Sequence, residues 1–246
     1  MPTTIEITTE DGVCPAHVFH PPGTGPWPAV LFFMDGIGIR PALFEMAERL
    51  AGHGYYAILP DLYYRAGPYE PMDARRVFTD PEMRQTLFQK FMGKLGPANA
   101  MRDTRAVLAF LAGQPAALPG KIGATGYCMG GGFAISAAGQ FPDRFAAVAA
   151  YHPGNLATDA PDSPHLLAPS IRARVYVGGA SDDPSFPDAM KARLETALRD
   201  AGVDHTVETY PARHGWVPSD TPVHDPAAAE RHWQTLFALL DGALKR

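Results

Sequence analysis

Residues 122–133 read IGATGYCMGGGF, so Cys128 has one glycine two positions before it and another two positions after it. The apolar residues before the cysteine have the pattern of a short buried strand, and the residues from Met129 onward open a helix. A sharp turn from strand to helix forces the residue at its tip into strained backbone angles, and flanking glycines relieve the crowding. The stretch therefore predicts a nucleophile elbow with Cys128 at its tip, and the alternative is a small buried structural cysteine.

The chain on either side of this turn alternates between short apolar runs and longer stretches of helical periodicity. This alternation is typical of strands joined by crossover helices into a parallel sheet, with helices on both faces. The expected strands are Ala29–Met34, Tyr55–Pro60, Lys121–Gly126, Phe145–Tyr151, Arg174–Val177 and His205–Tyr210. The expected helices are Ala42–Ala51, Asn99–Ala112, Met129–Gln140, Asp188–Ala201 and Pro226–Leu244. The stretch TIEITTEDGVCPAHVFHPPG near the N-terminus predicts an antiparallel hairpin that turns at Asp11-Gly12.

Length and composition indicate a globular protein. The chain has 246 residues, of which 46% are hydrophobic and 19% charged. At this length one core can bury most of the apolar surface, so we expect a single α/β domain over residues 1–246. Residues 65–98 interrupt the strand-helix rhythm and are rich in proline, arginine and aromatic residues. Such a segment is either a cap over a site or a solvated surface excursion, and the sequence favours neither.

Charge and hydropathy argue against two classes of partner. The net charge is -5 and the basic residues are scattered, whereas proteins that bind nucleic acid usually carry a clustered basic stripe. The longest apolar run, Pro28–Met34, is far shorter than the roughly 20 residues that span a bilayer. The N-terminal residues show no signal peptide, and Cys14 and Cys128 are too few for a disulfide framework, so we expect a cytoplasmic location.

Two later stretches place polar residues beyond strand ends. RVYVGGASDDPSFP puts Asp182 and Asp183 after one expected strand, and VETYPARHGWVP puts His214 after the next. In an α/β-hydrolase triad, the nucleophile comes first along the chain, the acid second, and the histidine third, before the last helix. The start of a helix also favours a thiolate and lowers the pKa of a cysteine placed there. Together these features favour a catalytic Cys128 over a structural one.

Several motifs together resemble the dienelactone hydrolase family over about residues 29–216: GYCMGG, GASDDPSFP, YPARHGW and the early FFMDGIGIRP and GYYAILPDLYYRAGP. The resemblance implies an α/β-hydrolase fold, no metal or organic cofactor, and cleavage of a small-molecule ester or lactone through an acyl-enzyme. By position, Cys128 matches the family nucleophile, His214 the base and Asp183 the acid. Asp182 stays an alternative acid, because the tandem aspartates leave the register open by one residue.

The chemistry of such a triad assigns further roles. His214 would take the thiol proton while Asp183 orients the imidazole, and the thiolate would attack a carbonyl. The resulting oxyanion needs preorganised donors, for which we expect the backbone N–H groups of Met129 and of Gly36 in the loop after the first parallel strand.

Asp35 stands where the resemblance places an acidic residue, usually glutamate, close to the nucleophile. Like charges at short range disfavour the second ionisation, so Asp35 is expected to raise the pKa of the Cys128 thiol. The free enzyme would then hold a protonated, slowly reacting thiol until substrate moves or neutralises the acid. The shorter aspartate leaves a plain loop acid as the alternative.

Arg84 lies roughly where the family places an arginine for the substrate carboxylate, although Arg75 and Arg76 are alternatives in the same segment. A second family arginine is expected just after the catalytic histidine, but Val217 and Pro218 occupy those positions. The departure favours a less acidic or bulkier ester as substrate.

Other residues have weaker signals. Tyr127 and Trp216 are expected to line the acyl pocket, with plain packing as the alternative. His152 is expected to be structural or solvated, and Cys14 to be a small hydrophobe on a strand. No pair of histidines has a metal-ligand spacing.

Two other functions stay open at this point. One is a redox or acyl-transfer thiol, although no resolving cysteine lies near Cys128 in the sequence. The other is a non-catalytic binding protein of the same fold, which would be expected to have lost a member of the triad. The chain is expected to act as a monomer or homodimer on a small molecule.

Overall fold

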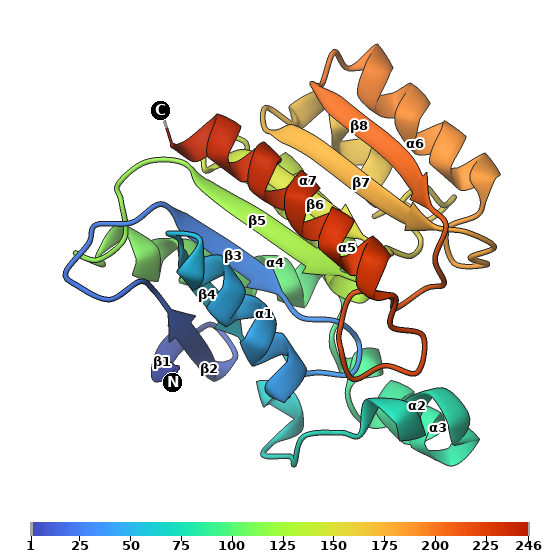
Figure 1. Cartoon of the computed structure of the whole chain (residues 1–246), viewed down its shortest axis with the longest axis horizontal. Helices are drawn as coiled ribbons and strands as arrows, with labels where there is room; N and C mark the ends of the chain where they lie inside the picture. The colour runs from blue at the N-terminus through green and yellow to red at the C-terminus, as the bar shows by residue number, and fades with distance from the viewer. Residues whose placement is uncertain (1, 246) are drawn as a thin grey trace.

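The computed structural model describes residues 2–245, which form an eight-stranded sheet with the order β1-β2-β4-β3-β5-β6-β7-β8 (Figure 1). The strands are β1 (Thr3–Thr9), β2 (Gly12–Phe19), β3 (Ala29–Phe33), β4 (Tyr56–Pro60), β5 (Ile122–Tyr127), β6 (Phe145–Tyr151), β7 (Arg174–Ala180) and β8 (His205–Tyr210). The pairs β1–β2 and β2–β4 are antiparallel, and the other neighbours are parallel. The predicted N-terminal hairpin is confirmed, because Thr9 pairs with Gly12 across its turn.

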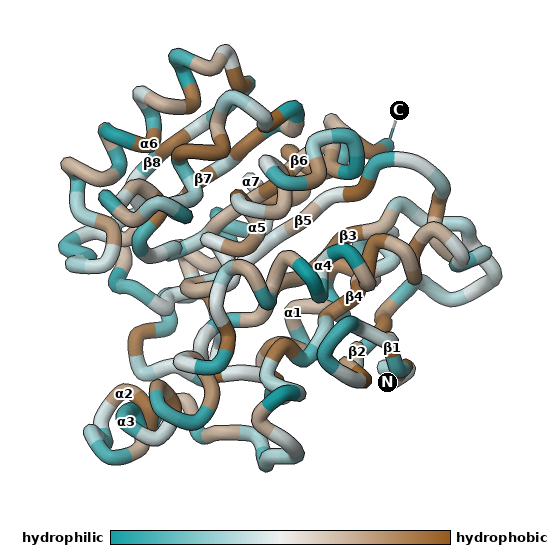
Figure 2. The backbone as a smooth tube through the Cα atoms, turned by 180° about the vertical axis from the view of Figure 1, so that it is seen from behind, coloured by the Kyte–Doolittle hydropathy of each residue, from teal (hydrophilic) through white to brown (hydrophobic). Residues whose placement is uncertain are grey.

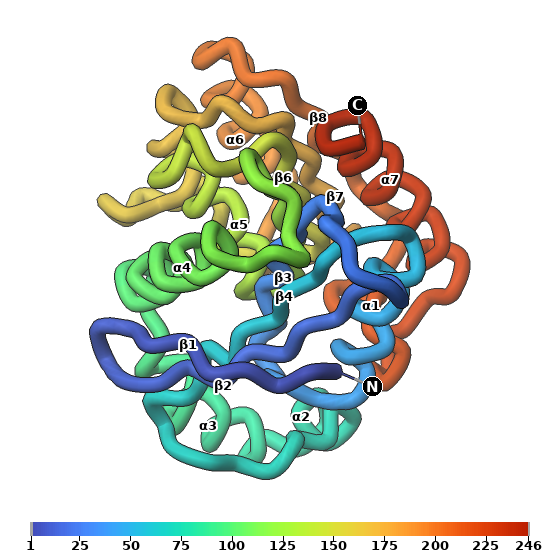
Figure 3. Tube along the Cα trace, turned by 90° about the vertical axis from the view of Figure 1, so that its left-hand side faces the viewer, coloured from blue at the N-terminus to red at the C-terminus, as the bar shows by residue number. Residues whose placement is uncertain are grey.

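Helices connect the strands and cover both faces of the sheet. They are α1 (Pro41–Gly52), α2 (Ala74–Thr79), α3 (Pro81–Lys90), α4 (Pro97–Ala112), α5 (Met129–Gln140), α6 (Asp188–Asp200) and α7 (Pro226–Leu244), with the short 3-10 helices η1 (Tyr64–Ala66), η2 (Met92–Lys94) and η3 (Pro164–Ser170). Figure 3 shows α1 and α7 on one face and α4 and α5 on the other. The predicted α/β architecture is confirmed. Within residues 2–245, no helix has the length and apolar character needed to cross a bilayer.

The core lies where parallel strands are covered on both faces. Every residue of β3, β4 and β5 is buried, whereas in the edge strand β8 only Tyr210 is buried. Strands covered on both sides read as continuous apolar runs, which is why these were visible in the sequence. Figure 2 shows the hydrophobic residues following β3 and β4 through the molecule. The expected end of β7 was too early, because Gly178 and Gly179 continue the ladder with β8.

The predicted turn from strand to helix at Cys128 is confirmed. Cys128 has φ 54° and ψ -119° and precedes the first residue of α5. Its N–H donates to the Tyr151 carbonyl at 3.1 Å, which ties the turn to β6. A Cβ atom on Gly126 would lie 2.0 Å from the Gly130 carbonyl oxygen, so β5 and α5 approach more closely than side chains allow. The two glycines flanking the cysteine are therefore required by the turn itself.

Residues 65–98, for which a cap or a surface excursion was expected, contain α2, α3 and η2. Each α-helix starts at an aspartate: the Asp73 carboxylate accepts from the N–H groups of Arg75 and Arg76, and Asp80 caps α3 in the same way. Figure 1 shows α2 and α3 standing apart from the sheet, near the loop that follows β8. Residues of α2, α3 and η2 also line a cavity.

Replacing Gly130 by alanine should destabilise the protein, because the added Cβ would lie 2.4 Å from the Met34 carbonyl oxygen. We expect the free energy of unfolding to fall by about 1–3 kcal/mol, the usual cost of overpacking. Gly132 in the same helix is the control, since its Cβ would meet only Leu156 at 3.8 Å. Gly132→Ala should be neutral or stabilising by up to about 1 kcal/mol. Urea denaturation measures both, and equal stability of the two variants would contradict the close approach at Gly130.

Candidate active site

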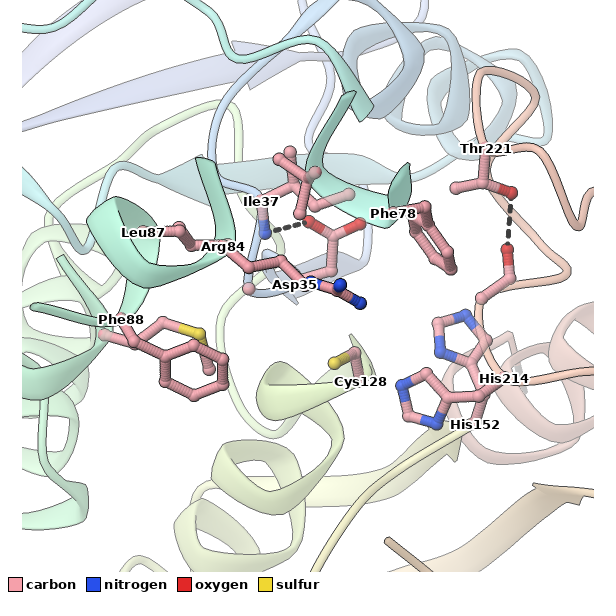
Figure 4. Close-up of a pocket in the computed structure, with 14 residues that line it drawn as sticks. Asp35, Ile37, Phe78, Arg84, Leu87, Phe88, Cys128, His152, His214 and Thr221 are labelled. Carbon is pink, nitrogen blue, oxygen red and sulfur yellow. Dashed lines mark hydrogen bonds between the residues drawn. The ribbon is translucent and has the colours of Figure 1, made fainter. Parts of the chain in front are cut away.

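The residues singled out from the sequence meet at the carboxyl ends of neighbouring parallel strands. Asp35 and Gly36 follow β3, Cys128 follows β5, Asp183 follows β7 and His214 follows β8. All except Asp183 line one cavity, and Figure 4 shows the Cys128 sulfur pointing into it beside His214. The crossover topology therefore brings together groups separated by up to 179 residues along the chain, from Asp35 to His214.

Asp183 holds His214. The His214 Nδ1 lies 2.6 Å from the Asp183 Oδ2, and the other carboxylate oxygen accepts from the Ser185 N–H at 2.9 Å and from its hydroxyl at 2.6 Å. Burial acts to raise the pKa of Asp183, but the hydrogen bonds from His214 and Ser185 outweigh it and lower that pKa. Because Nδ1 is bonded to the carboxylate, the other ring nitrogen of His214 is free for Cys128.

The structure brings only one of the tandem aspartates to His214. Asp182 is exposed and has φ 52°, in the left-handed region, while Asp183 is 5% exposed and contacts the imidazole. Ser185 was not identified from the sequence. An aspartate side chain in a loop often accepts from the N–H two residues later, and Ser185 stands at that position after Asp183.

His214 and Cys128 are electrostatically coupled. Burial acts to lower the pKa of His214, but the hydrogen bond to Asp183 and the interaction with Cys128 outweigh it and raise that pKa to about 10. A raised pKa means that the imidazolium form of His214 persists through neutral pH. The arrangement thus suits an ion pair of imidazolium and thiolate, with Asp183 behind the imidazolium.

The loop after β3 presents one backbone N–H that the loop itself does not use. The Asp35 carbonyl accepts from the Gly38 N–H at 3.2 Å, the Gly36 carbonyl accepts from the Tyr63 hydroxyl at 2.7 Å, and the Ile37 N–H donates to the Asp35 side chain at 2.9 Å. The Gly36 N–H lies between these anchored groups and borders the cavity. Tyr63, which fixes this peptide, was not identified from the sequence.

Met129 supplies a second candidate donor. It is the first residue of α5, and the first N–H groups of a helix have no acceptor within the helix. These N–H groups also carry the positive end of the helix dipole, which favours negative charge nearby. Gly36 borders the first cavity and Met129 the second, both with Cys128, so their N–H groups stay the candidate donors of an oxyanion hole.

Asp35 lines the cavity with Cys128, but its carboxylate is already paired. Arg40 donates from Nη1 to Oδ1 and from Nη2 to Oδ2, both at 2.8 Å, and also binds Asp220 from Nε at 2.7 Å. Arg40 therefore offsets part of the effect predicted for Asp35 on the thiol, and that effect stays a prediction. Arg40 was missed because a lone arginine before Pro41 reads as an ordinary helix start, and its partner Asp220 is 180 residues away.

Two connected cavities open from Cys128 and His214 and share Phe88 and Met92. The first, of about 280 Å³, is walled mainly by apolar side chains from residues 65–98 and the β3 loop: Ile37, Val77, Phe78, Leu87, Phe88 and Met92. The second, of about 550 Å³, adds polar side chains on the side of α5: Ser136, Asn155, Thr158, Asp162, Ser163 and Ser185. Part of the segment expected as a cap or an excursion therefore borders the site.

Arg84 also lines the first cavity, and Figure 4 shows its side chain extending from α3 into the space above Cys128. Within residues 2–245, no hydrogen bond or ion pair of the Arg84 side chain is found, so the guanidinium is available to a bound molecule. The alternatives Arg75 and Arg76 lie on α2, outside the lining.

Tyr127 and Trp216 do not line either cavity, which corrects the expectation that they form the acyl pocket. Tyr127 is fully buried on β5, where its hydroxyl lies 2.8 Å from the His232 Nε2. Trp216 is also fully buried and stacks on Tyr210 with ring centroids 4.8 Å apart. Alternation along the strand turns Tyr127 into the sheet face under α7, while only the next residue, Cys128, faces the cavity.

His152, which was expected to be either structural or solvated, is buried, and it borders the first cavity. Its ring centroid lies 5.2 Å from that of His214, and burial lowers its pKa well below the usual value, so it is neutral. Cys14 is fully buried on β2, where burial raises its pKa. Within residues 2–245, no three histidine, cysteine, aspartate or glutamate side chains are grouped as a metal site would need.

The comparisons with known proteins agree with this geometry. The sequence pattern of the dienelactone hydrolase family matches residues 14–244. A Methylorubrum extorquens protein named "Putative carboxymethylenebutenolidase" is 31% identical over 239 residues, which is 94% of this chain and 78% of the relative. A Synechocystis protein of the same name is 25% identical over 253 residues, covering 99% of this chain and 97% of the relative.

A crystal structure from Klebsiella pneumoniae, named "Putative Dienelactone Hydrolase", superposes with a TM-score of 0.84 at 24% identity, and the match covers 98% of both chains. This likeness confirms the predicted α/β-hydrolase fold. With the family pattern spanning nearly all of the sequence, the chain belongs to the dienelactone hydrolase family.

Proposed function

We propose that this hydrolase cleaves an ester or lactone through an acyl-enzyme on Cys128, with His214 as base and acid and Asp183 as the residue that orients His214. The observation that carries the proposal is the 2.6 Å contact between the His214 Nδ1 and the Asp183 Oδ2, beside a cysteine held at the tip of a strand-to-helix turn. A cysteine nucleophile needs a base within reach and a third group that fixes the base.

In acylation, the Cys128 thiolate adds to the carbonyl carbon, and the carbonyl electrons move to the oxygen. The N–H groups of Gly36 and Met129 would stabilise that oxyanion. When the tetrahedral intermediate collapses, the carbon–oxygen bond to the leaving group breaks, and the alkoxide takes the proton from the His214 imidazolium. In deacylation, neutral His214 accepts a proton from water, the hydroxide adds to the thioester, and the acid leaves with regeneration of the thiolate.

The cavity walls favour a particular substrate class. Besides Arg84, Asp35, His152, Thr221 and the proposed catalytic groups, the side chains that line the first cavity are apolar, so it suits a compact apolar group that carries an anion toward Arg84. The second cavity offers hydroxyl and amide groups and suits a neutral polar part. A lone arginine, without a second one after His214, fits one carboxylate or a polarised carbonyl better than a strongly acidic substrate.

An acyl transferase that uses the same thiol is the second candidate, because the polar second cavity could hold an acceptor alcohol. The two functions differ in what attacks the thioester. Product analysis with water and with a small alcohol present separates them: a hydrolase gives mostly the free acid.

Cys128→Ala should abolish turnover of p-nitrophenyl esters and small lactones while the circular dichroism spectrum stays unchanged. In the wild type, mass spectrometry of a quenched reaction should find one acyl group on the peptide that contains Cys128. Cys14→Ala is the matched control and should retain full activity, since that thiol is buried away from the site. Turnover by Cys128→Ala at the wild-type rate would end the proposal, and also exclude the acyl transferase.

Asp183→Asn should lower kcat by about 10²–10⁴-fold, because the amide cannot stabilise the imidazolium and favours the wrong tautomer. Asp182→Asn is the control on the adjacent position and should change kcat less than about 3-fold, because that side chain does not contact His214. Steady-state kinetics at pH 7 measures both variants. The reverse ranking would assign the acid role to Asp182.

Arg84→Gln should reduce kcat/KM for esters with an acyl carboxylate by about 5- to 30-fold, equivalent to about 1–2 kcal/mol, and leave neutral esters of the same size nearly unchanged. Arg75→Gln, on α2 outside the cavity, is the matched control for net charge. A panel of paired neutral and anionic esters measures the selectivity. Equal losses for both variants would show general charge steering in place of a specific contact at Arg84.

A further inference from the structure

We propose that Arg40 is a positioning residue that keeps the charge of Asp35 away from the Cys128 thiolate and holds the oxyanion loop in place. The inference rests on the proposed function of Cys128 and adds a residue that neither the sequence motifs nor the triad includes. Its basis is a buried guanidinium that joins the two loops on either side of the reacting atoms.

Arg40 is 1% exposed, and all five of its N–H donors are used. Nη1 binds the Asp35 Oδ1 at 2.8 Å and the Gly38 carbonyl at 3.1 Å. Nη2 binds the Asp35 Oδ2 at 2.8 Å and the Asp220 Oδ1 at 3.3 Å, and Nε binds the Asp220 Oδ2 at 2.7 Å. A planar guanidinium can bind two carboxylates by paired hydrogen bonds, which a lysine ammonium cannot.

The two carboxylates belong to different parts of the site. Asp35 belongs to the loop whose Gly36 N–H is the candidate oxyanion donor, and its side chain also fixes the Ile37 N–H. Asp220 belongs to the loop after His214, where the neighbouring Thr221 hydroxyl donates to the Gly215 carbonyl at 2.8 Å. Arg40 therefore links the oxyanion loop to the loop that carries the base.

The electrostatic role follows from where Asp35 lies. Asp35 and Cys128 border the same cavity. Both also act on the buried Tyr63: burial raises the pKa of Tyr63, and the negative charges of Asp35 and Cys128 raise it further. An unpaired carboxylate there would oppose the thiolate. Arg40 places one positive charge between two carboxylates, so the net charge of the Asp35–Arg40–Asp220 cluster is −1 in place of −2, and less negative charge opposes a thiolate on Cys128.

Other charged and titratable groups also act on Cys128, and the test must hold them constant. Besides Asp35 and the start of α5, the groups that border its two cavities or couple to it are Tyr63, Arg84, His152, Asp162 and His214. None of them is changed in the variants below.

The experiment is a charge cycle of Arg40→Met, Asp35→Asn and the double variant, read as the pH midpoint of iodoacetamide alkylation at Cys128. Arg40→Met exposes the thiolate to an unpaired Asp35, and its midpoint should rise by about one pH unit or more. Asp35→Asn changes the net charge of the Asp35–Arg40–Asp220 cluster from −1 to 0, and its midpoint should fall. The double variant should return to within about half a unit of the wild type. Buried Cys14 is the unreactive internal reference.

Two further variants separate charge from positioning. Arg40→Lys keeps the charge but not the paired hydrogen bonds, so its midpoint should stay near that of the wild type while kcat falls by about 10-fold or more, as expected for a misplaced oxyanion donor. Arg49→Met is the matched control, because Arg49 lies on the same helix and pairs with Glu230 at the surface at 2.7 Å. It should change neither quantity.

An unchanged midpoint in Arg40→Met, or a raised one in Asp35→Asn, would overturn the proposal. If Arg40→Met fails to fold, the comparison of Asp35→Asn with the double variant still decides, since the proposal requires the lower midpoint in Asp35→Asn. Alkylation needs no substrate, so this result is independent of whether Cys128 carries out ester hydrolysis. That separate question is answered by the turnover of Cys128→Ala.

Discussion

The close approach of β5 to the start of α5 is the constraint on which the site depends. Glycine at 126 allows β5 to come this near to α5, and glycine at 130 allows the same helix to approach the end of β3. Cys128 stands between them with φ 54° at the first turn of the helix. The same turn places the Met129 N–H beside the sulfur and bonds the cysteine N–H to β6. Backbone geometry alone thus fixes the nucleophile, one candidate oxyanion donor and the positive end of a helix dipole. The other candidate groups, Asp35, Asp183 and His214, lie beyond the carboxyl ends of other parallel strands of the sheet.

Charge pairing governs what the fixed thiol can do. Two of the acidic residues near Cys128 are each held by a cation: Asp183 by His214 and Asp35 by Arg40. The two pairs differ in function, because an imidazole can release its proton during the reaction and a guanidinium cannot. One pair can therefore move a proton, while the other can only hold charge and geometry. Burial strengthens both, since neither Asp183 nor Asp35 is more than 5% exposed.

The sequence was sufficient for features encoded within a few residues. The turn at Cys128, the hairpin at Asp11-Gly12 and the buried strands are local patterns of glycine and apolar residues, and all are found. Features that depend on which way a side chain faces were harder. Tyr127 is adjacent to the nucleophile but points to the opposite side of the sheet, and the choice between Asp182 and Asp183 depends on one left-handed residue in a loop. Arg40 binds Asp220, which lies 180 positions away in the sequence, and no local sequence pattern predicts such a contact.

Substrate selectivity resides in a different part of the structure from the catalytic groups. The apolar wall of the first cavity comes largely from α2, α3 and η2, short helices that begin at aspartate caps and bury few residues of their own. Helices this short gain little stability from their own hydrogen bonds, so packing against the site must hold them. Their residues can therefore change with little effect on β5 and α5, where even one added methyl group at Gly126 or Gly130 would meet backbone atoms. This separation explains why the fold and the candidate triad could be predicted from motifs, whereas the selectivity of the proposed reaction depends on residues 65–98, the segment with the least regular sequence pattern.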